Sequence, residues 1–207
     1  MSERDTSEPV TGPPAAETAA ETTDSTTDRT PAGRPAATGP RRLLLFGLVA
    51  AVALALDVVS KVLAVAELSD RDPVRLLGGA LYVQLARNPG AAFSQGTGFT
   101  VVITGLAVVI VLVILFTARR LRSRAWALAL GLVLGGALGN LVDRILRAPS
   151  PGKGHVVDWI SVFGPNGERY PIFNLADSAV CVGAVVIVVL ALRGIGLDGR
   201  RAEPRKR

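Results

Sequence analysis

Four long apolar blocks constrain this 207-residue chain more than any other feature of its sequence. They cover roughly residues 43–66, 99–118, 125–145 and 172–192. A helix needs about 20 apolar residues to cross the roughly 30 Å of hydrocarbon in a bilayer, and each block approaches or exceeds that length. Charged residues make up only 19% of the chain, less than is usual in soluble domains. The sequence therefore predicts an all-α membrane protein with four transmembrane helices.

The first block has a second interpretation, as a cleaved secretory signal. Ala64-Val65-Ala66 follows the apolar run of residues 43–56 and fits the small-x-small cleavage pattern. However, Asp57 and Lys61 lie between the run and that motif, and three more apolar blocks follow. These features favour a retained span, which N-terminal sequencing of the mature protein would test.

The two ends of the chain differ in composition from the spans. Residues 1–40 are rich in Thr, Ala, Pro, Asp and Glu. Such a segment cannot bury enough apolar surface to offset the entropy lost on ordering. We expect residues 1–40 to be a disordered cytoplasmic tail, residues 41–193 to be one four-span domain, and residues 194–207 to be a basic cytoplasmic tail.

Basic residues gather near the ends of the spans. The net charge of +6 would suggest a nucleic-acid partner in a soluble chain, but here it indicates orientation in the membrane instead. Arg41 and Arg42 precede the first span, residues 119–124 are mostly arginine, and the C-terminal tail is basic. Four spans bring these segments to one side, which should be the cytoplasmic side. The loops of residues 67–98 and 146–171 should then lie outside.

The first of these outer loops contains a stretch typical of a β-strand. Apolar and less apolar residues alternate over residues 80–87, with Leu81, Val83 and Leu85 on one face. Gly78-Gly79 and the Asn88-Pro89-Gly90 sequence bound the stretch as turn signals. We expect a strand there with one apolar face.

Three spans carry polar or charged residues at a similar depth, namely Asp57, Lys61, Asn140, Asp143, Arg144 and Asp177. A rise of about 1.5 Å per residue puts them all roughly 21–28 Å above the inner boundary of a 30 Å core. Ionisable groups inside a bilayer are costly and mark function by default. Their common level therefore predicts a shared polar site just below the outer surface.

Two patterns indicate helix contacts at that level. Gly131, Gly135 and Gly139 recur every four residues, a spacing of small residues that lets helix backbones approach closely. Asp57 and Lys61 are four residues apart and can form an ion pair on one helix face. That pair could be purely structural, or it could touch substrate or tune the site.

The side chains available for catalysis favour carboxylates. His155 is the one histidine and Cys181 the one cysteine, too few for a zinc site, which needs three or four ligands. We therefore expect no metal and no cofactor. Asp158 lies beside Trp159, an aromatic residue typical of the membrane interface. If Asp158 and Asp177 share a low-dielectric site, one of the two keeps a proton. Such a pair supplies a base that activates water and an acid for the leaving group of a peptide.

Three other classes of protein stay open. A Ser–Lys membrane peptidase would need Ser94 or Ser178 to approach Lys61, because the neighbouring Ser60 points to a different helix face. A small ion-coupled transporter also carries charges within its spans, although here these charges lie at one end and form no path to the inside. A non-catalytic assembly or chaperone protein is the third class.

Five short motifs follow one another in a specific order: residues 57–61 (DVVSK), 88–94 (NPGAAFS), 135–144 (GGALGNLVDR), 156–159 (VVDW) and 173–178 (FNLADS). With these motifs, residues 41–193 resemble the lipoprotein signal peptidase (signal peptidase II) family. Each motif alone is weak, but their combination is specific. The family often has Phe at the position of Trp159, which keeps an aromatic ring.

The resemblance implies a four-helix aspartic endopeptidase of the bacterial cytoplasmic membrane, with a small extracytoplasmic β-cradle, a half-helix and an active site near the outer face. Its substrates would be lipid-modified prolipoproteins, cut just before the diacylglyceryl cysteine among membrane lipids, and globomycin would inhibit it. The catalytic pair carried over is Asp158 and Asp177. Positions that match the family's substrate surroundings are Asn88, Gly90, Asn140, Arg144 and Asn174, and further supporting candidates are Asp57, Lys61 and Asp143.

The arginine asymmetry generates a prediction about topology. In a Cys181→Ser background, a cysteine placed within residues 119–124 should react with a membrane-impermeant thiol reagent only after the cells are opened. A cysteine within residues 67–98 should react in intact cells. Labelling of the 119–124 loop from outside alone would contradict the orientation and the depth argument with it.

Overall fold

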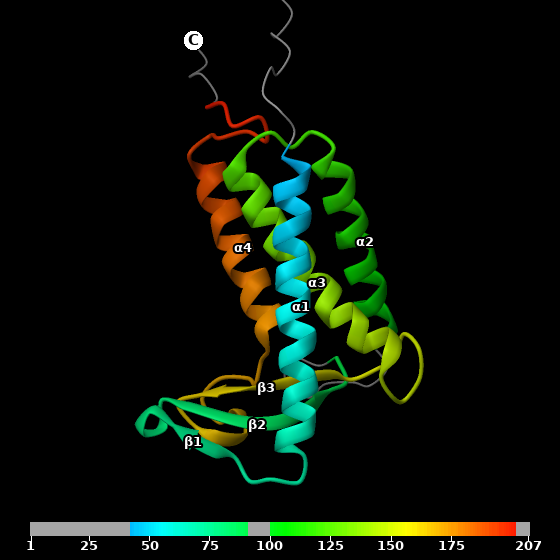
Figure 1. The fold of residues 1–207 in the computed structure, drawn as a ribbon, viewed down its shortest axis with the longest axis vertical. Helices are drawn as coiled ribbons and strands as arrows, with labels where there is room; N and C mark the ends of the chain where they lie inside the picture. The colour runs from blue at the N-terminus through cyan, green and yellow to red at the C-terminus, as the bar shows by residue number, and fades with distance from the viewer. Residues whose placement is uncertain (1–41, 91–99, 202–207) are drawn as a thin grey trace, which may run out of the picture. The chain divides into compact units, whose positions relative to one another are not determined.

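Four long helices form a bundle, and a small antiparallel sheet lies at one end of it (Figure 1). The structure is a computed structural model that describes residues 42–90 and 100–201, all within the compact unit Ala37–Arg207. The predicted disordered tail of residues 1–40, Ser94, Phe99 and the last six residues of the basic tail lie outside the described residues.

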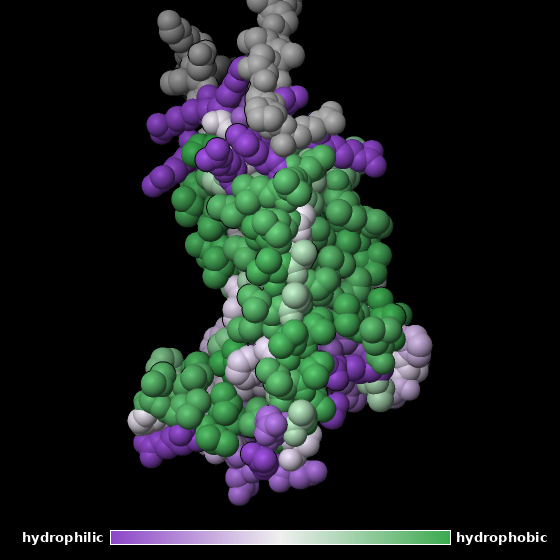
Figure 2. Space-filling model, viewed as in Figure 1, coloured by the Kyte–Doolittle hydropathy of each residue, from purple (hydrophilic) through white to green (hydrophobic). Residues whose placement is uncertain are grey.

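The helices confirm the predicted fold class. They are α1 (Leu43–Leu68), α2 (Thr100–Ala118), α3 (Arg124–Leu146) and α4 (Leu175–Leu192). All four are long and apolar enough to cross a membrane. Their outward faces carry large exposed aliphatic side chains, and the face drawn in Figure 2 is apolar along the helices and hydrophilic at both ends. Such an apolar surface suits contact with the hydrocarbon of a bilayer, where no water is present.

The fourth helix begins later than the sequence predicted, at Leu175 instead of residue 172. Phe173 is held outside the helix, because its backbone exchanges two hydrogen bonds, of 3.0 and 2.9 Å, with Ile160. Asn174 then caps the helix. As a result, Asp177 lies in the first turn of α4 and closer to the helix end than the depth count assumed.

The sheet consists of β1 (Val74–Leu76), β2 (Leu81–Asn88) and β3 (Val156–Val162), antiparallel and in that order. β2 confirms the predicted strand. β3 was not predicted from the residue pattern, although its run of β-branched residues is typical of a strand. The three strands together confirm the small β-cradle that the family resemblance implied. Within residues 69–90 and 147–174 the helical pieces are only two short 3-10 turns, η1 (Leu77–Gly79) and η3 (Pro165–Gly167). The half-helix implied by the family resemblance is therefore not found there.

Helix α3 lies at the centre of the bundle and packs against the other three helices. Its Gly131, Gly135 and Gly139 face α1, as the spacing predicted. A Cβ added at Gly135 would come within 2.6 Å of the Ala50 carbonyl oxygen, and one added at Gly139 would overlap the Asp57 carboxylate. These glycines therefore let α1 and α3 approach closely enough for their polar residues to meet.

The end of the bundle opposite the sheet carries Arg42 and the arginines of residues 119–124. There the Arg42 backbone donates to the Leu121 carbonyl at 3.0 Å, which ties the start of α1 to the α2–α3 loop. The C-terminal segment of residues 194–201 folds back onto that loop, since the Arg122 and Ser123 backbone N–H groups both donate to the Leu197 carbonyl at 2.9 Å. The sequence did not predict this fold-back. The three basic segments nevertheless gather at one end, which we call the arginine end.

The close approach of α1 and α3 leads to a stability prediction. Gly135→Ala should lower the free energy of unfolding in detergent by about 1–3 kcal/mol, the usual cost of overpacking. The matched control is Gly47→Ala, because a Cβ at Gly47 meets nothing within 4 Å. The control should be neutral or slightly stabilising. Equal effects of the two substitutions would show that the α1–α3 contact is not as close as described.

Candidate active site

Asp158 and Asp177 come together at the sheet end of the bundle, Asp158 from β3 and Asp177 from the first turn of α4. Asn174 joins them. Its side-chain amide donates to Asp158 Oδ1 at 2.6 Å, and its backbone N–H donates to Asp177 Oδ2 at 3.2 Å. The Asn174 side chain also accepts from the backbone N–H of Asp177 at 2.9 Å. Asn174 is therefore both the cap of α4 and the link between the two carboxylates.

The second oxygen of each carboxylate also accepts a hydrogen bond from an amide. Asn88 Nδ2 donates to Asp158 Oδ2 at 3.0 Å, and Asn140 Nδ2 donates to Asp177 Oδ1 at 2.8 Å. All four carboxylate oxygens thus have a fixed N–H donor. Because amide donors carry no net charge, they orient the carboxylates while leaving either one free to hold a proton.

The neighbouring charged residues also meet here. Lys61 Nζ lies 2.7 Å from Asp57 Oδ2 and 3.0 Å from Asp143 Oδ2, and it donates to Asn140 Oδ1 at 2.9 Å. The interpretation of Asp57 and Lys61 as a self-contained pair is therefore too narrow, since Lys61 also reaches α3. All three charged side chains are buried.

Arg144 and Gly90 border the same site. The Arg144 guanidinium is buried, and its Nη1 has no hydrogen-bond partner among the described residues. A Cβ added at Gly90 would lie 3.3 Å from Arg144 Nη1, and Gly90 has a φ of +114° that favours glycine. The glycine therefore lets the backbone at residue 90 lie close to the buried guanidinium.

Burial raises the pKa of the Asp158 carboxyl from its ordinary value of 3.8 to about 6. The nearby charge of Asp177 acts in the same direction, whereas hydrogen bonds from Asn88 and Asn174 and the charge of Lys61 lower the pKa. A carboxyl with a pKa near 6 can hold or release a proton close to neutral pH, as acid–base catalysis requires.

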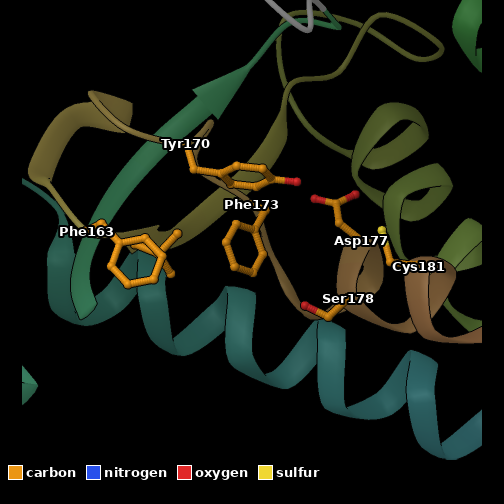
Figure 3. A pocket seen from close by; sticks show the side chains of 7 residues that line it. Phe163, Tyr170, Phe173, Asp177, Ser178 and Cys181 are labelled. Carbon is orange, nitrogen blue, oxygen red and sulfur yellow. The ribbon is translucent and has the colours of Figure 1, made fainter. Parts of the chain in front are cut away.

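A cavity of about 400 Å³ opens beside Asp177. Figure 3 shows the Tyr170 hydroxyl pointing toward the Asp177 carboxylate, with Ser178 and Cys181 on the same helix. The Tyr170 and Phe173 rings meet edge to face at 5.8 Å and form part of the wall. Sequence reasoning missed these two aromatic residues. Their place just before the fourth span was an available signal, since aromatic rings favour the membrane interface.

Within residues 42–90 and 100–201, no three His, Cys, Asp or Glu side chains form a group able to hold a metal ion. The functional groups of the described site are two carboxylates, their amide donors and an arginine. The fold and the site together define a multi-pass membrane protein with a carboxylate pair, one buried and one half-buried, at one end of its helices.

Comparison with known proteins identifies the family. The signal peptidase (SPase) II family profile matches residues 49–193. The lipoprotein signal peptidase of Rhodococcus jostii (strain RHA1) is 52% identical over 164 residues, covering 79% of this chain and 80% of the relative. That of Mycobacterium tuberculosis (strain H37Rv) is 49% identical over 173 residues, covering 82% and 83%. This chain belongs to the signal peptidase II family and is thus a membrane peptidase.

Two solved structures share the fold. Both are described as bacterial membrane enzymes, solved by the in meso method at 2.3 and 1.9 Å resolution. The first is 24% identical with a TM-score of 0.64 and covers 81% of this chain and 98% of its own. The second is 26% identical, also with a TM-score of 0.64, and covers 75% and 97%.

The amide donors around Asp158 generate a prediction about its titration. Infrared difference spectra should show the protonated Asp158 carboxyl, identified by its loss in Asp158→Asn, titrating with a midpoint near pH 6. Asn88→Ala removes a donor that lowers the pKa, so it should move the midpoint upward. Gln84→Ala is the control, because this amide of β2 contacts Asn166 instead. An unchanged midpoint in Asn88→Ala would contradict the arrangement.

The raised pKa of Asp158 also determines the direction in which stability changes with pH. The folded protein binds the Asp158 proton more tightly than the unfolded chain does, because the pKa is raised from 3.8 to about 6. This contribution to the free energy of unfolding is present below about pH 4 and is lost as the pH rises through 6. Asp158→Asn should remove that part of the pH dependence.

Proposed function

We propose that this chain is an aspartic endopeptidase that removes the signal peptide from diacylglyceryl-modified prolipoproteins, just before the lipidated cysteine. The observation that carries the proposal is the linkage of the buried Asp158 and the half-buried Asp177 through Asn174. Membership of the signal peptidase II family supports the substrate class. In this proposal Asp158 and Asp177 are the catalytic residues.

The reaction needs one proton shared between the two carboxyls. The ionised carboxylate takes a proton from water as the water oxygen attacks the scissile carbonyl carbon. The protonated carboxyl gives its proton to the departing amine of the cysteine as the C–N bond breaks. The products are a free carboxylate on the signal peptide and a free amine on the lipoprotein. One proton remains on the pair, now on the other aspartate.

The remaining residues of the site have roles in holding the substrate. Arg144 Nη1 is buried beside Gly90 without a hydrogen-bond partner among the described residues, and we assign it to a carbonyl oxygen of the substrate. Such a donor would hold the substrate backbone in place next to the carboxylates. Asn88, Asn140 and Asn174 orient the two aspartates.

The proposed orientation places the sheet end outside and the arginine end in the cytoplasm. Both termini are then cytoplasmic, as the positive-inside rule requires. A diacylglyceryl cysteine has its acyl chains in the outer leaflet, so its scissile bond lies near the outer surface. Asp177, in the first turn of α4, is at that level. Globomycin-type inhibitors would compete for the same site.

Among the described residues, which do not include Ser94, the geometry favours two carboxylates over a Ser–Lys pair. The Lys61 ammonium forms ion pairs with Asp57 and Asp143 and donates a hydrogen bond to Asn140. The hydroxyl of Ser178 donates to the Asn174 carbonyl at 3.0 Å, and that of Ser60 donates to the Asp57 carbonyl at 2.9 Å. A transporter is also disfavoured, because the charged residues within the spans, from Asp57 and Lys61 to Asp143 and Arg144, lie toward the sheet end.

The dyad proposal predicts that Asp158→Asn and Asp177→Asn each lower turnover of a lipidated precursor by at least about 10²–10⁴-fold, the scale of positioned acid–base groups. The double substitution should cost little more than either single one, because members of a catalytic unit are not additive. Turnover by equal amounts of folded enzyme is the measurement.

The matched control is Asp72→Asn, which removes an exposed carboxylate from the first loop and should leave turnover unchanged. Near-normal turnover by either dyad variant would rule out the proposed mechanism. A chelator such as EDTA should have no effect on the wild-type enzyme, since no step uses a metal.

A further inference from the structure

A second set of hydrogen bonds holds the backbone next to the two aspartates of the proposed dyad. Asp57 and Asp143 are fully or almost fully buried, and each bonds to the backbone next to one of the two aspartates. Asp57 Oδ1 accepts from the Ala176 N–H at 2.9 Å, one residue before Asp177. Asp143 Oδ2 accepts from the Val157 N–H at 3.1 Å, one residue before Asp158.

Lys61 joins the Asp57 and Asp143 carboxylates, which we call the two anchors. Its ammonium lies 2.7 Å from Asp57 Oδ2 and 3.0 Å from Asp143 Oδ2. Its third N–H bonds to Asn140 Oδ1 at 2.9 Å, and Asn140 itself holds Asp177. One side chain of α1 is therefore connected, through charge-assisted bonds, to the backbone beside both catalytic aspartates.

Stability alone does not account for this arrangement. Burying two carboxylates and an ammonium carries a large desolvation cost, and replacing such a group by apolar side chains is often neutral or stabilising. Charge-assisted bonds are short and directional, however, and fix the distance between the groups they join. The burial of Lys61 between the anchors is therefore better explained by geometry than by stability.

We propose that Lys61 is a positioning residue, which sets the spacing of Asp158 and Asp177 by joining the two carboxylates that hold the backbone before each of them. The inference rests on the proposed function, because spacing matters only if the two aspartates act together. A misplacement of catalytic groups by about 1 Å can cost about 10²-fold in rate. Lys61 contacts no substrate in this role, so its loss should affect kcat much more than KM.

The first test is Lys61→Met, which keeps a long side chain but removes the charge. The kcat for a diacylglyceryl precursor should fall about 10–10²-fold with little change in KM. Lys153→Met is the control, since Lys153 is exposed in the second loop and should be dispensable. A wild-type kcat in Lys61→Met would overturn the inference.

Lys61→Met leaves the buried Asp57 carboxylate without a cation and leaves Asp143 paired with Arg147 alone, so the variant could lose stability for that reason. The triple variant Asp57→Asn/Lys61→Met/Asp143→Asn removes all three charges, and the asparagine oxygens can still accept from the Ala176 and Val157 N–H groups. Its stability should return to the wild-type level or above it, while kcat stays low. Recovery of kcat together with stability would show that Lys61 serves folding only.

Asp158→Asn, assayed in parallel, separates this inference from the proposed function. If Asp158→Asn is inactive and the triple variant has wild-type kcat, only the positioning role fails. If Asp158→Asn keeps its activity, the dyad itself fails and the positioning role fails with it.

Discussion

The site depends on how four acidic side chains are accommodated at one end of an apolar helix bundle. Two of them, Asp57 and Asp143, are neutralised by Lys61 and Arg147 and bonded to backbone N–H groups. The other two, Asp158 and Asp177, face mainly neutral amide donors. This difference divides the acids into a charged pair that holds the backbone and a second pair in which a proton can be shared.

The position of the site within the fold follows from where the helices end. Asp177 sits in the first turn of α4, where the positive end of the helix dipole stabilises a carboxylate. Asp158 sits on β3, where burial raises the pKa of its carboxyl to about 6. Two carboxyls of similar type thus occupy different surroundings, one on a helix end and one on a buried strand. Such contrasts are how enzymes obtain an acid and a base from the same chemical group.

Much of this arrangement follows from the sequence, because its strongest determinants are local. Apolar length predicts the four spans, and the glycine spacing predicts a close helix contact along α3, although not that α1 is the partner. Strand β3 and the late start of α4 escaped prediction from the residue pattern, since β3 depends on its pairing with β2 and the start of α4 on the pairing of Ile160 with Phe173. The bond from Asp57 to the Ala176 N–H joins residues 119 positions apart, and no local pattern encodes it. The motifs indicated which residues gather but not that Asn174 links the two aspartates.

The central claim is that water, activated by the carboxylate pair, attacks the substrate directly without a covalent enzyme intermediate. Cleavage of a diacylglyceryl precursor in the presence of hydroxylamine tests this most directly, with the released signal peptide analysed by mass spectrometry. Direct attack by water predicts a free C-terminal carboxylate at every hydroxylamine concentration. A C-terminal hydroxamate that increases with hydroxylamine would reveal an acyl-enzyme and would contradict the account.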